Sequence, residues 1–185
     1  MRLDVLSDVN MGQSPAGESL NGTDGMEFHQ GKIYFGDLFL KHSPTKTNSP
    51  TKLAKPGDIL ICVRAPVGVV NITDREVCIG RGLAALTPKQ NVPASFLLHL
   101  LRHNQHSIEQ IATGSTFASI TTEQLRSIEL PVPNEAEWLR IAGIIRKKRK
   151  ICLPTSHLLR SPFGSVLIIQ TLPFPRPFPS NKPTS

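Results

Sequence analysis

Residues 56–86 have the sequence PGDILICVRAPVGVVNITDREVCIGRGLAAL, and they decide the fold of this chain. Three apolar runs follow one another here, at residues 59–63, 67–72 and 77–86, with Gly, Pro and Asp residues between them. Short runs rich in Val and Ile and bounded by such residues are typical of buried strands. We therefore expect one compact sheet on which the rest of the chain packs, with any function in the loops that the sheet supports.

The chain before these runs alternates only weakly between apolar and polar residues. Residues 1–10 and 26–40 both alternate, which predicts short strands or turns in each. Residues 41–55, KHSPTKTNSPTKLAK, have no periodicity and are rich in Ser, Thr, Pro and Lys, which predicts a loop. Lysines beside hydroxyl groups can hold phosphates, although the same composition also suits a solvated loop without a ligand.

Helical patterns follow the central runs. Leu97, Leu101, Ile108 and Ile111 fall along one face of a long predicted helix. Residues 121–124, TTEQ, predict a second, short helix that begins with a cap. Together with the central sheet, these helices predict a compact, β-rich domain of the α+β class with flanking helices.

Composition divides the chain into three parts. Residues 1–133 carry the patterned segments and predict a single domain. Residues 134–152 begin with a capping pattern, Asn134 with Glu137, and predict a shortened helix that ends before Pro154. Residues 153–185 are rich in proline, which predicts a poorly ordered tail.

The formal net charge of +7 favours a polyanionic partner, either nucleic acid or an acidic membrane surface, although a merely solvated basic surface gives the same value. No apolar stretch is long enough to span a bilayer, and the first residues have no apolar signal core. We therefore expect a cytoplasmic protein that does not enter a membrane. Cys62 and Cys78 lie inside apolar runs, which predicts small buried hydrophobic side chains.

Signals for catalysis, cofactors and metals are weak. Residues 80–85 match the dinucleotide pattern G-x-G-x-x-A, but Thr87-Pro88 prevents the helix that must follow, so we expect these glycines to permit close backbone approach. His99, His103 and His106 share a helix face, but that face points away from the apolar stripe, which predicts a solvated surface rather than a zinc site. We expect no cofactor and no catalytic centre.

Six motifs occur in an order that resembles a known family. They are Gly12-Gln13-Ser14-Pro15, Pro56-Gly57-Asp58-Ile59-Leu60-Ile61, Val63-Arg64-Ala65-Pro66-Val67-Gly68, Ile79-Gly80-Arg81-Gly82-Leu83-Ala84-Ala85, Gly114-Ser115-Thr116, and Leu130-Pro131-Val132-Pro133 followed by Glu137 and Arg140-Ile141-Ala142. Their order over residues 1–150 resembles a target-recognition domain of the DNA-specificity subunit of Type I restriction–modification systems.

The resemblance implies a non-catalytic subunit that reads double-stranded DNA. Such subunits carry two recognition domains in tandem, joined by long antiparallel helices that dock the methyltransferase subunits and, through them, the restriction subunit. This chain departs from the pattern, because it has one recognition domain, Glu137-Trp138 in place of the family's Glu-Gln pair, and prolines at 154 and 162. It resembles a truncated, single-domain version. Separately, the helix at 134–150 predicts a homodimer through these residues.

Candidate DNA contacts are basic or hydroxyl-bearing residues in the predicted loops and turns: Lys32, Lys46, Lys52, Arg64, Arg81, Ser115 and Thr116. Lysines and arginines there would meet phosphates, and Arg64 and Arg81 can also reach guanine edges. The alternative for these two arginines is an ion pair with Asp74 or Glu76.

Two other functions remain open from the residues alone. One is a small β-rich hydrolase or peptidase-like module that uses Ser14 or Ser115 with a lysine. The other is a protein–protein interaction fragment that acts through the helix at 134–150 and no longer binds DNA.

Overall fold

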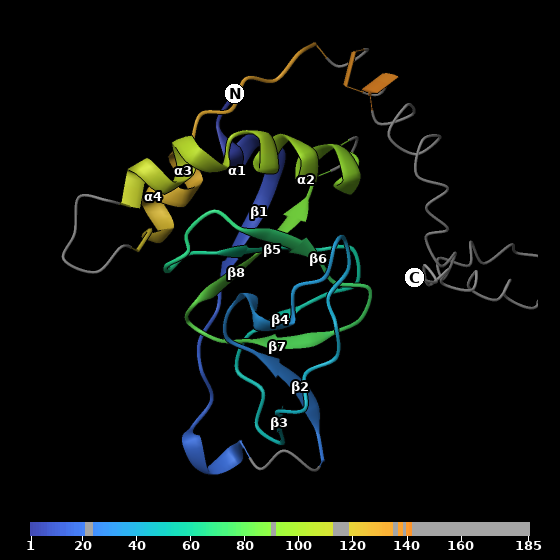
Figure 1. The fold of residues 1–185 in the computed structure, drawn as a ribbon, viewed down its shortest axis with the longest axis vertical. Coiled ribbons are helices and arrows are strands. Elements are labelled where there is room, and N and C mark those ends of the chain that lie inside the picture. The colour runs from blue at the N-terminus through green and yellow to red at the C-terminus, as the bar shows by residue number, and fades with distance from the viewer. Residues whose placement is uncertain (21–23, 90–91, 113–118, 135–136, 139, 142–185) are drawn as a thin grey trace, which may run out of the picture. The chain divides into compact units, whose positions relative to one another are not determined.

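Two four-stranded sheets, with helices at one end, make up the part of the chain that the structure describes (Figure 1). The structure is a computed structural model that describes residues 1–20, 24–89, 92–112, 119–134, 137–138 and 140–141. The strands are β1 (Ser7–Met11), β2 (Met26–His29), β3 (Lys46–Thr47), β4 (Leu53–Ala54), β5 (Ile59–Cys62), β6 (Val70–Ile72), β7 (Val77–Ile79) and β8 (Leu83–Pro88). The helices are α1 (Leu3–Leu6), α2 (Ala94–His103), α3 (Gln105–Ala112) and α4 (Thr122–Ser127), with short 3-10 turns η1 (Gly17–Ser19) and η2 (Lys32–Tyr34). This mixture confirms the predicted α+β class.

The strands belong to two sheets, so the prediction of a single central sheet is wrong. One sheet has the order β1-β8-β5-β6 and is antiparallel throughout. The other has the order β3-β2-β7-β4, and its central pair, β2 with β7, is parallel. Residues 77–86 do not form one strand, because they supply β7 to one sheet and β8 to the other. The turn Gly80-Arg81-Gly82 carries the chain between the sheets.

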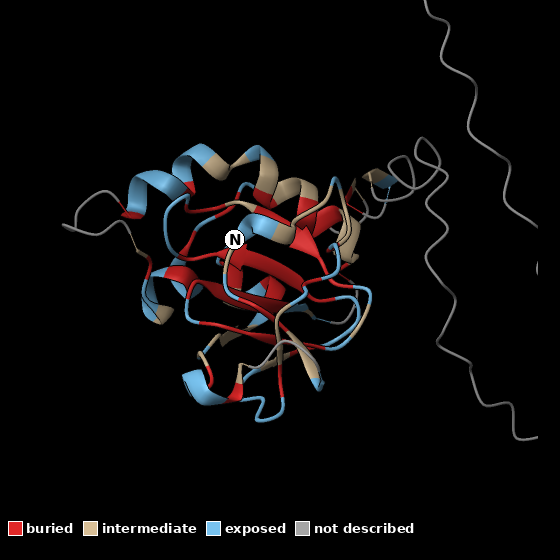
Figure 2. Cartoon of the chain, turned by 60° about the horizontal axis from the view of Figure 1, so that its bottom comes forward, coloured by how far each residue is buried: buried red, intermediate tan, exposed pale blue. Residues whose placement is uncertain are grey.

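Strand β5 is buried on both faces of its sheet, which explains why it is a continuous apolar run. Ile59 and Ile61 belong to a core that they share with the helices, whereas Leu60 and Cys62 belong to a second core that they share with β4 and β7. Figure 2 shows buried residues, in red, along the strands in the middle of the domain. Residues 77–86 are likewise buried on both sides of Gly80, so their apolar character does not show where β7 ends and β8 begins.

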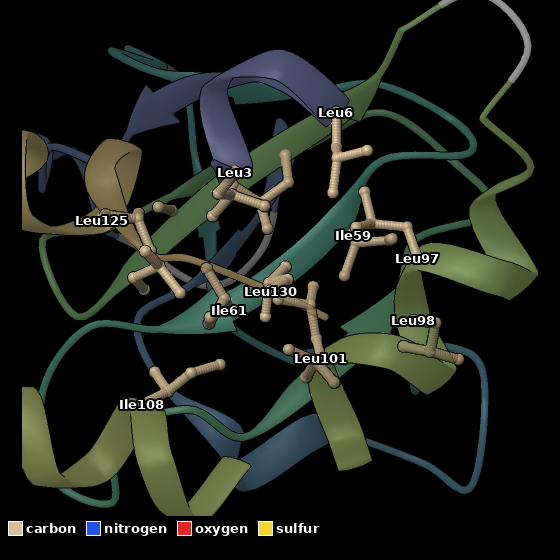
Figure 3. Close-up of a cluster of buried hydrophobic side chains, with 14 of the residues drawn as sticks. Leu3, Leu6, Ile59, Ile61, Leu97, Leu98, Leu101, Ile108, Leu125 and Leu130 are labelled. Atoms are coloured by element: carbon tan, nitrogen blue, oxygen red, sulfur yellow. The ribbon is translucent and has the colours of Figure 1, made fainter. Parts of the chain in front are cut away.

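The helices close the larger core, as Figure 3 shows for its leucines and isoleucines. Three of the predicted core positions are buried there: Leu97, Leu101 and Ile108. The long predicted helix is interrupted at Asn104, whose side-chain Nδ2 donates to the carbonyl oxygen of Leu100 at 2.8 Å. Ile111 lies beyond this break with 38% of its surface exposed, so its predicted place in the core is wrong. Within the described ranges, no helix is long and apolar enough to cross a membrane.

Residues 41–55 are more regular than the predicted loop. They contribute β3, which pairs with β2, and β4, which pairs with β7. The side-chain amide of Asn10 also donates to the carbonyl oxygen of Leu53 at 2.9 Å and holds β4 near the first sheet. Strands of two residues are too short to show alternation, so the sequence could not reveal them.

The first residues of the chain pair with the segment that follows α4. The Met1 amino group donates to the carbonyl oxygen of Leu130 at 2.8 Å, and the Leu130 amide donates back to Met1 at 2.9 Å. The Leu3 amide donates to the carbonyl oxygen of Ile128 at 2.9 Å. The predicted cap of α4 is confirmed, because the side chains of Thr121 and Gln124 each accept a hydrogen bond from the other's backbone amide.

The structure describes only a few residues beyond Pro133. Asn134 Oδ1 accepts a hydrogen bond from the Glu137 amide at 3.0 Å, as the capping pattern predicts. Trp138 is 8% exposed and packs on Phe96, with their ring centroids 5.7 Å apart. The remainder of the predicted helix at 134–152 and the predicted tail at 153–185 lie outside the described residues, so these boundaries stay predictions.

Candidate nucleic-acid interface

The turn Gly80-Arg81-Gly82 lies where several segments of the chain meet. Four backbone hydrogen bonds hold this junction. The Gly80 amide donates to the carbonyl oxygen of His29 at 2.7 Å, and the Ile79 amide donates to that of Lys52 at 2.8 Å. The Gln13 amide donates to the carbonyl oxygen of Ile79 at 3.0 Å, and the Val63 amide donates to that of Gly82 at 3.0 Å. The turn and the adjoining Ile79 are therefore fixed to the end of β2, the segment after β1, the segment before β4 and the residue that follows β5. Side chains that leave this junction start from a rigid backbone.

Two positions of the junction have room only for glycine. A Cβ atom at position 82 would overlap the carbonyl oxygen of Gln30, and one at position 12 would overlap the carbonyl oxygen of Gly80. Both obstacles are backbone atoms, which cannot rotate away as a side chain can. This confirms the prediction that the glycines permit close backbone approach, although they lie in a turn and not within a strand.

Four of the predicted DNA contacts have their backbones beside this junction. Arg81 is the middle residue of the turn, and Lys52 accepts a hydrogen bond from Ile79 through its carbonyl oxygen. Arg64 directly follows the residue bonded to Gly82, and Lys32 lies two residues after Gln30. All four residues are exposed: Lys32, Lys52, Arg64 and Arg81. Exposed cations around one rigid turn suit the phosphates of a nucleic acid, which fix a protein's register on its target.

The predicted alternative for the two arginines, an ion pair with Asp74 or Glu76, does not occur. Asp74 pairs with Arg75 instead, with 2.7 Å between Oδ1 and Nη1. Among the residues that the structure describes, neither Arg64 nor Arg81 forms an ion pair. Their guanidinium groups are therefore available to an external anion.

The remaining candidates are not brought to the junction. Lys46 lies on β3, half-buried and opposite Glu27, two strands away from β7. Ser115 and Thr116 lie outside the described residues. Ser14, one of the two serines of the hydrolase alternative, accepts a hydrogen bond of 3.5 Å from the Arg81 amide. No described lysine or histidine forms a hydrogen bond with Ser14, so nothing in this part of the chain supports the hydrolase alternative.

Lys32 also lies near the end of β5. Burial raises the pKa of the Cys62 thiol to about 11, and the positive charge of Lys32 lowers it by a smaller amount. The thiol is therefore neutral and packs as a small hydrophobic group, as predicted.

The basic excess of the chain is not spread over the domain. All 14 acidic residues lie at or before Glu137, whereas residues 146–150, RKKRK, come after it. The net charge of +7 therefore arises in the C-terminal residues, and it is not a property of the two sheets. Any attraction that the folded domain exerts on a polyanion must come from local groups of cations, such as the one at the junction.

An ionic network that no sequence pattern indicated begins on β2. The Glu27 carboxylate accepts hydrogen bonds from Arg75 Nη2 at 2.7 Å, His42 Nδ1 at 2.6 Å and His29 Nε2 at 3.3 Å. Arg75 Nη1 also donates to the carbonyl oxygen of Leu40 at 3.2 Å. The network thus ties β2 to the segment before β3 and to the loop before β7.

The network keeps Glu27 ionised. Burial by itself would raise the pKa of Glu27, but hydrogen bonds from Arg75, His42 and His29 overcome that effect and lower the pKa to about 2. Burial lowers the pKa of His29, and its bond to Glu27 opposes this by less. Glu27 and Arg75 are 48 residues apart, so no local pattern could have paired them.

Comparisons with known proteins agree on one family. The profile of the Type I restriction modification DNA specificity domain matches residues 2–151. The putative type I restriction enzyme MjaX specificity subunit of Methanocaldococcus jannaschii is 42% identical over 136 residues, which are 72% of this chain and 32% of that protein. The type I restriction enzyme EcoR124I/EcoR124II specificity subunit of Escherichia coli is 28% identical over 109 residues, which are 54% of this chain and 26% of that protein.

Solved structures give the same result. The HsdS subunit from Thermoanaerobacter tengcongensis superposes with a TM-score of 0.69 and 36% identity, over 81% of this chain and 36% of that one. The S subunit from M. genitalium shares the fold, with a TM-score of 0.61 and 22% identity over 78% of this chain and 37% of that one. This chain thus spans about a third of the length of the MjaX specificity subunit and of the HsdS subunit. Because the profile covers most of the chain, the chain belongs to the family of Type I restriction–modification DNA specificity domains.

Proposed function

We propose that this chain binds a specific sequence of double-stranded DNA as the specificity component of a Type I restriction–modification complex in the cytoplasm. In this proposal the chain has no catalytic activity, and partner subunits carry out methylation and cleavage. The observation that carries the proposal is the group of exposed cations at the Gly80–Gly82 junction, in which Arg64 and Arg81 form no ion pair with a described residue. Membership of the family supports it.

In this mechanism, Lys32 and Lys52 contact phosphates and fix the register of the domain on the duplex. Arg64 and Arg81 start from rigid backbone and can each reach a guanine edge with two parallel hydrogen bonds. Lys46, Ser115 and Thr116 remain further candidates for phosphate contacts.

Replacing Arg81 by alanine is expected to weaken binding to a selected duplex by about tenfold, within the range measured for one bidentate base contact. If Arg81 reads a guanine, the loss is confined to sequences that carry guanine at one position. If it meets a phosphate, affinity falls for all sequences, and the slope of log affinity against log salt falls by about one. Fluorescence anisotropy titrations at several salt concentrations measure both quantities.

Arg126→Ala is the matched control, because Arg126 is exposed on α4 and takes no part in the hydrogen bonds that hold the junction. It should leave affinity and salt slope unchanged. A wild-type chain that binds all duplexes equally, or whose affinity ignores salt, would overturn the proposed function.

We further propose that residues 134–150 dock a methyltransferase subunit, which in turn recruits the restriction subunit, and that two copies of this chain associate through the same residues. Support comes from the position of this segment after the recognition domain and from Trp138, whose packing on Phe96 fixes the start of the segment to the core. Analytical ultracentrifugation of the full chain at micromolar concentration should give the mass of two chains. The mass of one chain would remove the homodimer.

A further inference from the structure

Ile33 is a large apolar side chain that the fold holds in solvent. It is 83% exposed, compared with 55% for Val5 and 38% for Ile111. A lone exposed apolar side chain is common on protein surfaces, so exposure by itself has no functional meaning. What distinguishes Ile33 is its setting, because it lies in η2, between Lys32 and Tyr34, at the mouth of a pocket.

The turn that carries Ile33 is firmly held. The Phe35 amide donates to the Lys32 carbonyl oxygen at 2.9 Å and closes the turn. The Tyr34 ring packs edge-on against the His29 ring, with their centroids 5.8 Å apart. The Lys41 amide also donates to the Tyr34 carbonyl oxygen at 2.7 Å. The exposed side chain therefore extends from an ordered turn.

The pocket beside Ile33 has a volume of about 270 Å³. Residues that line it include Phe28, Gln30, Ile33, Tyr34, Ser43 and Thr45. The ionic network described above supports one wall, because Glu27 accepts a hydrogen bond from the Ser43 amide at 3.4 Å. The pocket is thus a preformed cavity with an apolar rim and a few hydrogen-bonding groups, which is the usual composition of a site for a flat, partly apolar ligand.

The pocket adjoins the group of cations. Gln30 lines the pocket, and its carbonyl oxygen is the atom that Gly82 approaches so closely. Lys32 belongs to the same turn as Ile33 and is exposed. Ile33 therefore lies beside the cations that would hold an anionic polymer.

We propose that this pocket reads a T·A base pair in the major groove, with Ile33 against the C5-methyl group of the thymine. The methyl group is the one apolar feature that unmodified base pairs present in that groove, and glutamine is a common partner of the adenine opposite. Gln30 is therefore placed to bond that adenine. The inference rests on the proposed function and names one specificity-determining side chain within it.

The test is a selection of duplexes from a random pool with the full chain and with the Ile33→Ala and Val5→Ala variants. Val5 is the matched control, since it is also aliphatic and exposed but lies on α1. The wild-type and Val5→Ala chains should select the same sequence, with thymine at one position. The preference of the Ile33→Ala chain for thymine at that position should fall by about fivefold, and its preferences at the other positions of the sequence should not change.

A second measurement changes only the DNA. Replacing the thymine by uracil removes the methyl group, and it should weaken wild-type binding by about fourfold, the effect of burying one methyl group. The same replacement should have no effect on Ile33→Ala, because the two changes remove the same contact.

The outcomes separate the two claims. If the wild-type chain selects no sequence, the proposed function fails. If it selects a sequence that Ile33→Ala leaves unchanged, or if uracil is neutral at every thymine of that sequence, the proposed function stands and the pocket inference is overturned. If Ile33 contacted a protein partner and not the DNA, the Ile33→Ala chain would select the same DNA sequence as the wild-type chain.

Discussion

Replacing Gly82 by alanine is expected to destabilise the domain by about 3 kcal/mol, at the upper end of the usual cost of forcing extra atoms into a packed site. The new Cβ would overlap the backbone carbonyl oxygen of Gln30. Relief of that overlap requires the junction between the two sheets to open, and Gly82 also accepts a hydrogen bond from Val63. Urea denaturation followed by the fluorescence of Trp138, the single tryptophan, measures the change in free energy of unfolding.

Gly17→Ala provides the control for the intrinsic effect of losing a glycine. Nothing lies within 4 Å of a Cβ built at Gly17. Its free energy of unfolding should change by less than about 0.5 kcal/mol, the usual range for surface substitutions. Equal stabilities for Gly82→Ala and Gly17→Ala would contradict the tight packing of the junction.

Replacing Arg75 by methionine is expected to destabilise the domain by about 2 kcal/mol at neutral pH. Removing one partner of a fully buried ion pair typically costs about 3–5 kcal/mol. The cost is smaller here because the Arg75 and Glu27 side chains retain 24% and 16% of their exposure. Arg126→Met, an exposed site on α4, is the control and should be nearly neutral. The free energy of unfolding in urea gives both values.

The pH dependence of this loss tests its cause. Because the pKa of Glu27 falls from 4.5 to about 2 on folding, its contribution is complete above pH 4.5 and disappears as the pH approaches 2. The pKa of His29 is also lowered on folding, so His29 further destabilises the domain as the pH falls below about 6.5. The difference between wild type and Arg75→Met should therefore shrink between pH 4.5 and pH 2. A difference that stays constant over this range would show that lost packing, and not the ion pair, causes the destabilisation.

The sequence predicted those features that depend on residues close together in the chain. Thr121 and Gln124 form the expected cap because capping depends on residues three apart. Leu97 and Leu101 are buried because helical spacing places them on one face. The break at Asn104 was not predictable from that spacing, since it depends on a side-chain bond to Leu100.

Long-range pairing explains what the sequence did not reveal in the fold. The parallel pairing of β2 with β7 joins Phe28 to Cys78, which are 50 residues apart in the chain, and no local pattern encodes such a pairing. Residues 77–86 were wrongly predicted as one strand because the segments on both sides of Gly80 are buried, so their hydrophobicity does not change where the chain leaves one sheet for the other.

The candidate site was predictable only in part. Arg64 and Arg81 were identified from their position at strand ends, and the structure brings both to one junction. Ile33 was missed because an isoleucine in an alternating segment is expected in the core. Only the tertiary structure shows that it is exposed beside a pocket.

The pairing of Met1 and Leu3 with the segment Ile128–Leu130 makes the recognition domain a closed module. The first residues of the domain and the residues that follow α4 therefore lie side by side. Replacing the residues between these paired segments would therefore leave the two ends of the domain bonded to each other. Under the proposed function, such a replacement would change the DNA sequence that the chain binds and would leave the pairing of its ends intact.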